Sequence, residues 1–198
     1  RQQRTSLRVQ DHVLVVVDVQ NDFADPRGSL YVAGGELVAV EANAQIGAAR
    51  AAAAPVVYTQ DWHPAATPHF QKDGGIWPVH CVAESWGASL YPSLEVAGEV
   101  VRKGTAGEDG YSGFTCRDPV SGTPEPTKLE TLLRSKGVER LVVLGLATDY
   151  CVIATVLDGL RLGYPVLVVR NAIRAVDLNP GDGEQALEAM AAAGARFE

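Results

Sequence analysis

The stretch ERLVVLGLATDYCVIATVLDGLRLGYPVLVVRN, residues 139–171, contains two apolar runs separated by a mixed segment. The runs 139–146 and 164–171 are rich in valine and leucine, which is typical of strands buried on both faces of a sheet. Residues 148–163 are predicted to form a helix that ends at Gly163. The order strand, helix, strand predicts a parallel pair joined by a right-handed crossover.

The same alternation continues along the rest of the chain. Further strands are predicted at 12–20, 55–61 and 99–104, and further helices at 34–54, 126–137 and 181–194. This pattern predicts an α/β fold, with a doubly wound, Rossmann-like and mainly parallel sheet of about six strands and helices on both faces. Sheets of this kind bind their ligands beyond the carboxyl ends of the strands.

A single domain, residues 1–198, is expected because no linker or internal repeat is visible. Residues 61–98 interrupt the alternation, with many prolines, glycines, histidines and tryptophans and little periodicity. A stretch of this length without its own secondary structure is usually functional in a compact domain. We therefore expect a loop at about 61–98 to contribute to a functional site.

The composition and net charge of the chain limit the kinds of binding partner and the cellular compartment that we expect. The formal net charge of −7 disfavours nucleic acid or an anionic membrane as the main partner. No apolar run approaches the roughly 20 residues that a membrane helix needs, and the basic segment 1–12 leads into no signal-type region. Cys81, Cys116 and Cys151 form no CxxC pair, so we expect a reduced, cytoplasmic protein. The alanine-rich helices are compatible with a homo-oligomer.

Polar residues stand at or just beyond the ends of several predicted strands. Asp18 interrupts the first strand, Asp61 and Lys103 end the next two, and Cys151 follows the run 139–146. Each residue alone is more commonly a cap, a surface charge or a core residue. Together, chain-distant polar groups at one edge of a parallel sheet indicate an active site.

Cys151 could be a core residue, a redox partner, a metal ligand or a nucleophile. With Thr148 as N-cap it would lie in the first helical turn, where the dipole and free N–H groups favour a thiolate and can hold an oxyanion. Lys103 would lower the pKa of the thiol further, and Asp18 could take its proton and return it to a leaving amine. Cys151, Asp18 and Lys103 together supply the groups needed for attack on an amide carbonyl. From these residues alone, a structural cysteine that packs the helix against the sheet is the alternative.

The loop supplies a second constellation of Asp61, His63, His69 and His80. Neutral imidazole and carboxylate groups suit Zn, Fe or Mn. The spacing matches neither HExxH nor a zinc finger, so histidines that satisfy loop hydrogen bonds are the alternative. Cys81 is the poorer candidate ligand, because neighbouring residues of an extended loop point apart.

Five motifs occur in a fixed order along the chain: DVQNDF (18–23), DWHPAATPHF (61–70), WPVHC (77–81), KGTAGEDGYSGF (103–114) and GLATDYCV (145–152). In this set the chain resembles the nicotinamidase/pyrazinamidase branch of the isochorismatase-like hydrolases. The resemblance implies hydrolysis of nicotinamide to nicotinate and ammonia through a cysteine thioester, with pyrazinamide as a further substrate. Relatives that act on N-carbamoyl amides share the triad but lack the histidine-rich loop, and they are the alternative within this superfamily.

The resemblance also implies roles for individual residues. The catalytic triad of the family falls on Asp18, Lys103 and Cys151. Its ligands for one divalent metal ion, zinc foremost with Fe or Mn as alternatives, fall on Asp61, His63, His69 and His80. That metal would bind the pyridine nitrogen and orient the ring, whereas in a rival scheme it would activate water and Cys151 would be structural.

Further features of the family fall on the segments around the triad. Its cis peptide falls at Leu146–Ala147, and its oxyanion-hole amides belong to Ala147 and Cys151. The aromatic walls around the pyridine ring fall on Phe23, Trp77 and Tyr111. Gln20 and Asn21 are expected to hold the site together rather than to react.

Overall fold

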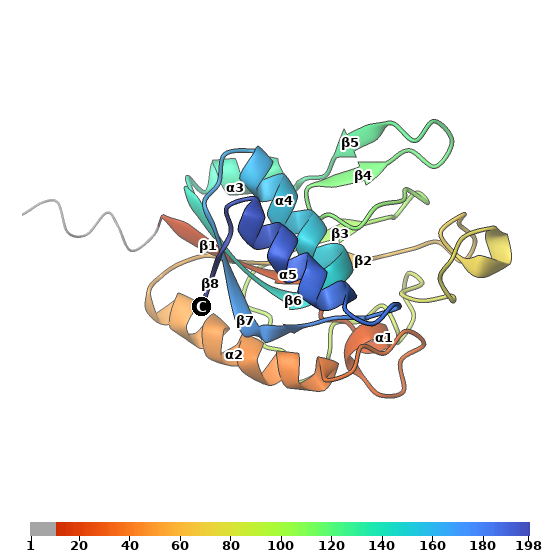
Figure 1. The fold of residues 1–198 in the computed structure, drawn as a ribbon, viewed down its shortest axis with the longest axis horizontal. Helices are drawn as coiled ribbons and strands as arrows, with labels where there is room; N and C mark the ends of the chain where they lie inside the picture. Colours follow the sequence, from red (N-terminus) through yellow and green to blue (C-terminus); the bar gives the residue numbers. More distant parts are fainter. Residues whose placement is uncertain (1–10) are drawn as a thin grey trace, which may run out of the picture.

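The fold is seen in a computed structural model, which describes residues 11–198. Its centre is a six-stranded sheet in the order β3-β2-β1-β6-β7-β8, in which every neighbouring pair is parallel (Figure 1). The strands are β1 (His12–Val17), β2 (Val56–Asp61), β3 (Glu99–Lys103), β6 (Arg140–Leu146), β7 (Val166–Arg174) and β8 (Arg196–Phe197). The predicted α/β fold with a mainly parallel sheet is confirmed.

The strand order reverses between β1 and β6, which lie side by side with His12 opposite Arg140 and Val17 opposite Gly145. From β1 the chain builds outward through β2 to β3, and it then returns to build outward on the other side. In an open parallel sheet, the crevice beyond the carboxyl ends at such a reversal is where ligands bind. The segments that follow β1 and β6 therefore reach the position where a site is expected.

Helices cover both faces of the sheet (Figure 1). On one face lies α2 (Gly35–Ala51); on the other lie α3 (Leu129–Ser135), α4 (Ile153–Arg161) and α5 (Asp182–Ala192). Side chains alternate along β1, so Leu14 and Val16 pack with the α2 residue Ile46, while Val13 and Val15 pack with Leu133 and Met190 of the opposite layer. The valine-rich strand β1 therefore contributes side chains to two apolar cores, one on each face of the sheet.

Several local features differ from the sequence-based expectation. The strand predicted at 12–20 ends at Val17, because Asp18 adopts a positive φ of 49° and leaves the sheet. The helix predicted from 148 begins as a π-helical turn, Thr148–Val152, and continues as α4. Ala147, with extended backbone and no capping side chain, precedes that turn, so the prediction of Thr148 as the N-cap is wrong.

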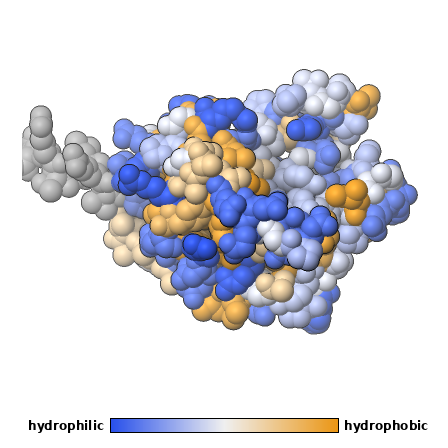
Figure 2. Space-filling model, viewed as in Figure 1, coloured by the Kyte–Doolittle hydropathy of each residue, from blue (hydrophilic) through white to orange (hydrophobic). Residues whose placement is uncertain are grey.

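Short elements complete the molecule. These are α1 (Asn21–Ala24), a 3-10 turn (Gln71–Asp73) within the predicted loop, and an antiparallel hairpin of β4 (Thr115–Arg117) and β5 (Pro124–Pro126). On the face drawn in Figure 2, patches of hydrophobic residues lie among hydrophilic ones. Within residues 11–198, no helix combines the length and the apolar character that crossing a bilayer requires.

Candidate active site and metal centre

The carboxyl ends of β1 and β3 and the turn after β6 bring three functional groups together. Asp18 directly follows β1, Lys103 is the last residue of β3, and Cys151 lies in the π-helical turn. All three are buried, with 0, 5 and 6% of their surface exposed. Lys103 Nζ lies 2.9 Å from Asp18 Oδ2 and 3.5 Å from Cys151 Sγ. Asp18 and Cys151 also place a carboxylate oxygen and the sulfur within 4.8 Å of each other, so the three predicted triad residues lie together.

Neighbouring groups fix the orientation of this triad. The Thr59 hydroxyl donates to Asp18 Oδ1 at 2.7 Å, and the Asp18 N–H donates back to the Thr59 hydroxyl at 3.2 Å. Lys103 Nζ also donates to the Tyr111 carbonyl at 2.6 Å. With these contacts the carboxylate and the ammonium each have a defined position beside the thiol.

Burial dominates the protonation of the triad. It raises the pKa of Asp18 and raises that of Cys151 well above the usual range, while the Lys103 ammonium opposes both shifts. Burial would lower the pKa of Lys103 itself, but Asp18 and Asp61 hold it well above the usual range. The resting cysteine is therefore a thiol, contrary to the expectation that a helix start would favour the thiolate, and it needs a base to become a nucleophile.

The turn that carries Cys151 begins at an unusual backbone position. The peptide bond between Leu146 and Ala147 is cis. The N–H groups of Tyr150 and Val152 both donate to the Ala147 carbonyl, at 3.1 and 3.0 Å. Within the described chain, the Cys151 N–H that lies between them makes no bond to that carbonyl. This N–H is one of the two proposed for an oxyanion.

Next to the triad, His63, His69 and His80 form a buried group. Each offers a ring nitrogen, and these nitrogens lie within 4.8 Å of one another. Both nitrogens of His63 are buried without a hydrogen-bond partner in residues 11–198, which is costly unless another ligand satisfies them. Burial lowers the pKa of His80 to about 4, so its imidazole is neutral at neutral pH. A cluster of buried imidazole nitrogens in which one ring has no hydrogen-bond partner fits a divalent metal ion.

Asp61 lies between the histidines and the triad. Its Oδ2 is 3.6 Å from His63 Nε2, and its Oδ1 is 3.2 Å from Lys103 Nζ. Although burial alone would raise the pKa of Asp61, Lys103 and His63 lower it below its usual range. The carboxylate is therefore ionised and faces both groups, as a metal ligand beside the triad would.

Comparison with known proteins shows the family to which this chain belongs. The isochorismatase domain family matches residues 12–197. This chain belongs to the isochorismatase family. The chain is 38% identical to the nicotinamidase of Escherichia coli, with 92% of each chain covered. It is 33% identical to the ureidoacrylate amidohydrolase of Methylobacterium radiotolerans, over 80% of this chain and 65% of that protein.

A solved structure in this family has the same architecture. The crystal structure of the pyrazinamidase of Pyrococcus horikoshii in complex with zinc superimposes with a TM-score of 0.85. The two chains are 36% identical, and the match covers 95% of this chain and 98% of the other. The isochorismatase fold therefore accounts for nearly the whole chain.

In this isochorismatase-family chain, Cys151 of the triad lines a cavity of about 30 Å³ that Asp61, His69 and His80 also line. Phe23, Trp77 and Tyr111, the predicted aromatic walls, all line it, together with Cys151. Trp77 Nε1 donates to the Tyr111 hydroxyl at 3.0 Å, which ties two of the walls together.

Sequence reasoning missed other residues that line this cavity: Leu30, Val32, Tyr150 and Val176. The Tyr150 ring packs edge-on against Trp77 and Tyr111, with centroids 4.9 and 5.3 Å apart. Its place next to Cys151 in the sequence was an available signal. For Val176 no such signal exists, because it reaches the site only through the loop after β7.

Supporting residues lie behind the reactive groups. The Gln20 side chain donates to the Asp61 carbonyl at 2.8 Å and accepts from the Asp61 N–H at 2.9 Å, which pins the end of β2. The N–H of Cys81 donates to Asp22 Oδ2, and its thiol is buried in the core outside the histidine group. Cys116 lies half-buried in the β4–β5 hairpin.

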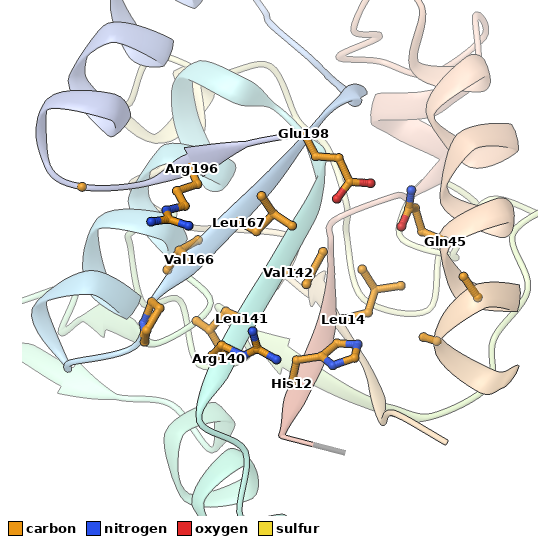
Figure 3. Close-up of a pocket in the computed structure, with 14 residues that line it drawn as sticks. His12, Leu14, Gln45, Arg140, Leu141, Val142, Val166, Leu167, Arg196 and Glu198 are labelled. Carbon is orange, nitrogen blue, oxygen red and sulfur yellow. The ribbon is translucent and has the colours of Figure 1, made fainter. Parts of the chain in front are cut away.

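A second cavity, of about 690 Å³, lies at the opposite ends of the strands (Figure 3). Figure 3 shows His12 and Arg140 at the starts of β1 and β6, Gln45 on α2 and Glu198 near the end of the chain. None of the predicted site residues lines it. Although this cavity is the larger of the two, it is not the candidate active site, because the predicted functional side chains lie elsewhere.

Proposed function

We propose that this protein is a nicotinamidase that hydrolyses nicotinamide to nicotinate and ammonia, and that it also accepts pyrazinamide. The observation that carries the proposal is that Cys151, held in a buried triad with Asp18 and Lys103, shares one aromatic-walled cavity with His69 and His80 of the histidine group. Similarity to the nicotinamidase of Escherichia coli and the pyrazinamidase of Pyrococcus horikoshii supports it.

Asp61, His63, His69 and His80 would hold one divalent metal ion, zinc foremost with Fe or Mn as alternatives. The ion would supply a Lewis acid for the nitrogen of a pyridine ring. Phe23, Trp77 and Tyr111 would then hold the ring between aromatic surfaces, which bury it and fix its plane. The residues thus present the carboxamide to Cys151.

The triad performs the chemistry in two halves. Asp18 takes the proton of the Cys151 thiol, and the sulfur attacks the carboxamide carbon. The N–H groups of Ala147 and Cys151 hold the oxyanion that forms on the carbonyl oxygen. As the carbon–nitrogen bond breaks, Asp18 returns the proton to the leaving ammonia, and a thioester remains.

Asp18 then accepts a proton from water, which attacks the thioester carbonyl. The carbon–sulfur bond breaks, nicotinate is released and Cys151 recovers its proton. Throughout, the ammonium of Lys103 stabilises negative charge on Asp18 and on the sulfur, 2.9 and 3.5 Å away.

We further propose that the chain acts as a single domain in the reducing cytoplasm. Cys81, Cys116 and Cys151 are all unpaired in the structure. A reduced setting would keep Cys151 available as a nucleophile.

The second candidate is a hydrolase of N-carbamoyl amides. It is favoured by the relative from Methylobacterium radiotolerans, a ureidoacrylate amidohydrolase, and by the triad, which suits any amide carbonyl. Against it stand the three buried histidines beside the triad, because attack by Cys151 does not by itself require them.

A substrate panel separates the two candidates. Purified zinc-loaded protein is given nicotinamide, pyrazinamide and ureidoacrylate in parallel, and ammonia release is measured for each. We expect turnover of the two ring carboxamides, loss of that turnover after chelation and its return when zinc is added back. Preference for ureidoacrylate, or full nicotinamide turnover by metal-free protein, would contradict the proposal.

A further inference from the structure

Asp109 makes a contact with the histidine group that its place in the sequence did not reveal. Its Oδ1 lies 2.8 Å from His69 Nδ1. The same oxygen accepts the Gly110 N–H at 2.8 Å. The backbone of Asp109 pairs in both directions with Arg117 on β4, at 3.0 and 2.7 Å. The carboxylate is therefore held against His69 from a braced position.

We propose that Asp109 is a positioning residue for the metal centre, which fixes the ring and the tautomer of His69. An ionised carboxylate only accepts hydrogen bonds, so Nδ1 of His69 must carry the proton. Nε2 is then left with a lone pair for a metal ion. A carboxylate in this position also makes the imidazole a more basic ligand. The inference rests on the proposed function, because it requires that His69 binds a metal.

The other two histidines are oriented differently. His80 Nδ1 contacts the Pro78 carbonyl at 2.7 Å, which is a neutral partner. His63 has no hydrogen-bond partner on either nitrogen within residues 11–198. Asp109 therefore gives His69 a carboxylate partner, and this carboxylate is more than half exposed. We expect its loss to weaken the metal site rather than to abolish it.

The same loop also carries groups of the triad and of the cavity wall. Lys103, the last residue of β3, directly precedes it. The Tyr111 carbonyl accepts a hydrogen bond from the Lys103 ammonium, and the Tyr111 hydroxyl accepts one from the Trp77 N–H. Asp109 therefore links the metal ligand His69 to the segment that positions the catalytic lysine.

Two matched substitutions test this role. Asp109→Asn and Glu108→Gln each remove one negative charge from the same loop, but only Asp109 contacts His69. Glu108 accepts the Ala106 N–H, which a glutamine oxygen can also do. Zinc affinity is measured by competition with a chromophoric chelator, the cobalt(II) absorption spectrum reports ligand geometry, and the melting temperature of the metal-free protein reports folding.

Asparagine can still accept the His69 N–H but lacks the charge that makes the imidazole a more basic ligand. We therefore expect Asp109→Asn to weaken zinc binding about tenfold, at the lower end of the range for such partners, since the carboxylate is also 57% exposed. Its cobalt spectrum should change, while the metal-free protein should melt near the wild-type temperature. Glu108→Gln should match wild type in all three measurements.

Equal zinc affinity and equal cobalt spectra for the two variants would overturn the role of Asp109. So would a large drop in the melting temperature of metal-free Asp109→Asn, since the residue would then act on folding. His63→Ala separates this failure from that of the proposed function. If the wild-type protein binds no zinc, or if His63→Ala binds zinc as tightly as wild type, these histidines do not form a metal centre. Asp109 then cannot have the proposed role.

Discussion

Lys103 is a buried cation with anionic or acidic groups on several sides. A buried lysine ordinarily loses its charge, but Asp18 and Asp61 lie 2.9 and 3.2 Å from its Nζ and keep it protonated. Its ammonium also lowers the pKa of Cys151 against the effect of burial. The lysine therefore stabilises every negative charge that the proposed reaction places on Asp18 or on sulfur.

Lys103→Gln should slow alkylation of Cys151 by iodoacetamide. Removal of the cation raises the pKa of the thiol further and leaves less thiolate at neutral pH. One charge of opposite sign typically shifts a neighbouring pKa by 1 to 3 units, so a decrease of about tenfold or more is expected. The rate is followed by mass spectrometry of the Cys151 peptide, because Cys116 can also react.

Arg102→Gln is the matched control for that experiment. Arg102 is the preceding cation on β3, but its side chain lies over the Trp62 ring, 3.7 Å from the centroid. Alkylation of Cys151 should be unchanged in this variant, and nicotinamide should protect the cysteine in both the control and wild type. Wild-type alkylation rates in Lys103→Gln would contradict the electrostatic role of Lys103.

At the scale of elements, the close approach of β6 to β1 positions the turn that holds Cys151. Gly145 has a φ of 129°, and a Cβ added there would lie 2.1 Å from the Val17 carbonyl oxygen. No side chain fits that space without moving the backbone of β1. The glycine therefore sets the distance between the strand ends that carry Asp18 and Cys151.

Gly145→Ala should destabilise the protein by about 3 kcal/mol, since overpacking adds to the strain of a positive φ. Gly47→Ala in α2 is the matched substitution: a Cβ there meets no atom within 4 Å, and alanine is favoured in a helix by roughly 0.5–1 kcal/mol. The free energy of unfolding, measured with denaturant, should fall in the first variant and rise in the second. Similar changes in both would show that the approach of β6 to β1 is not tight.

The main strands and helices could be predicted because each contains a run of apolar residues bounded by residues that end regular structure, such as glycine and proline. The short ones were not. β8 has only two residues. α1 begins with polar side chains that are buried by other parts of the chain, so its own sequence does not predict a buried helix. The sequence predicts a regular helix start at Thr148–Val152, but the structure has a π-helical turn there, which follows Ala147 and the cis peptide before it.

At the scale of the whole molecule, convergence at one sheet edge made much of the candidate site predictable. Parallel strands end at the same edge, so the sequence alone predicts that Asp18, Lys103 and Cys151 lie together. Contacts between loops could not be anticipated in the same way. Asp109 meets His69 across 40 positions of sequence, and nothing in the spacing of either loop fixes that approach.

Nicotinamide turnover by Cys151→Ala tests whether Cys151 is the nucleophile, and Cys116→Ala is the control for loss of a thiol outside the site. Both variants are loaded with zinc, their metal content is measured, and ammonia release is compared with wild type. If Cys151 is the nucleophile, Cys151→Ala keeps its zinc but loses at least about 10⁴-fold in turnover, while Cys116→Ala behaves as wild type. Near wild-type ammonia release by zinc-loaded Cys151→Ala would contradict it.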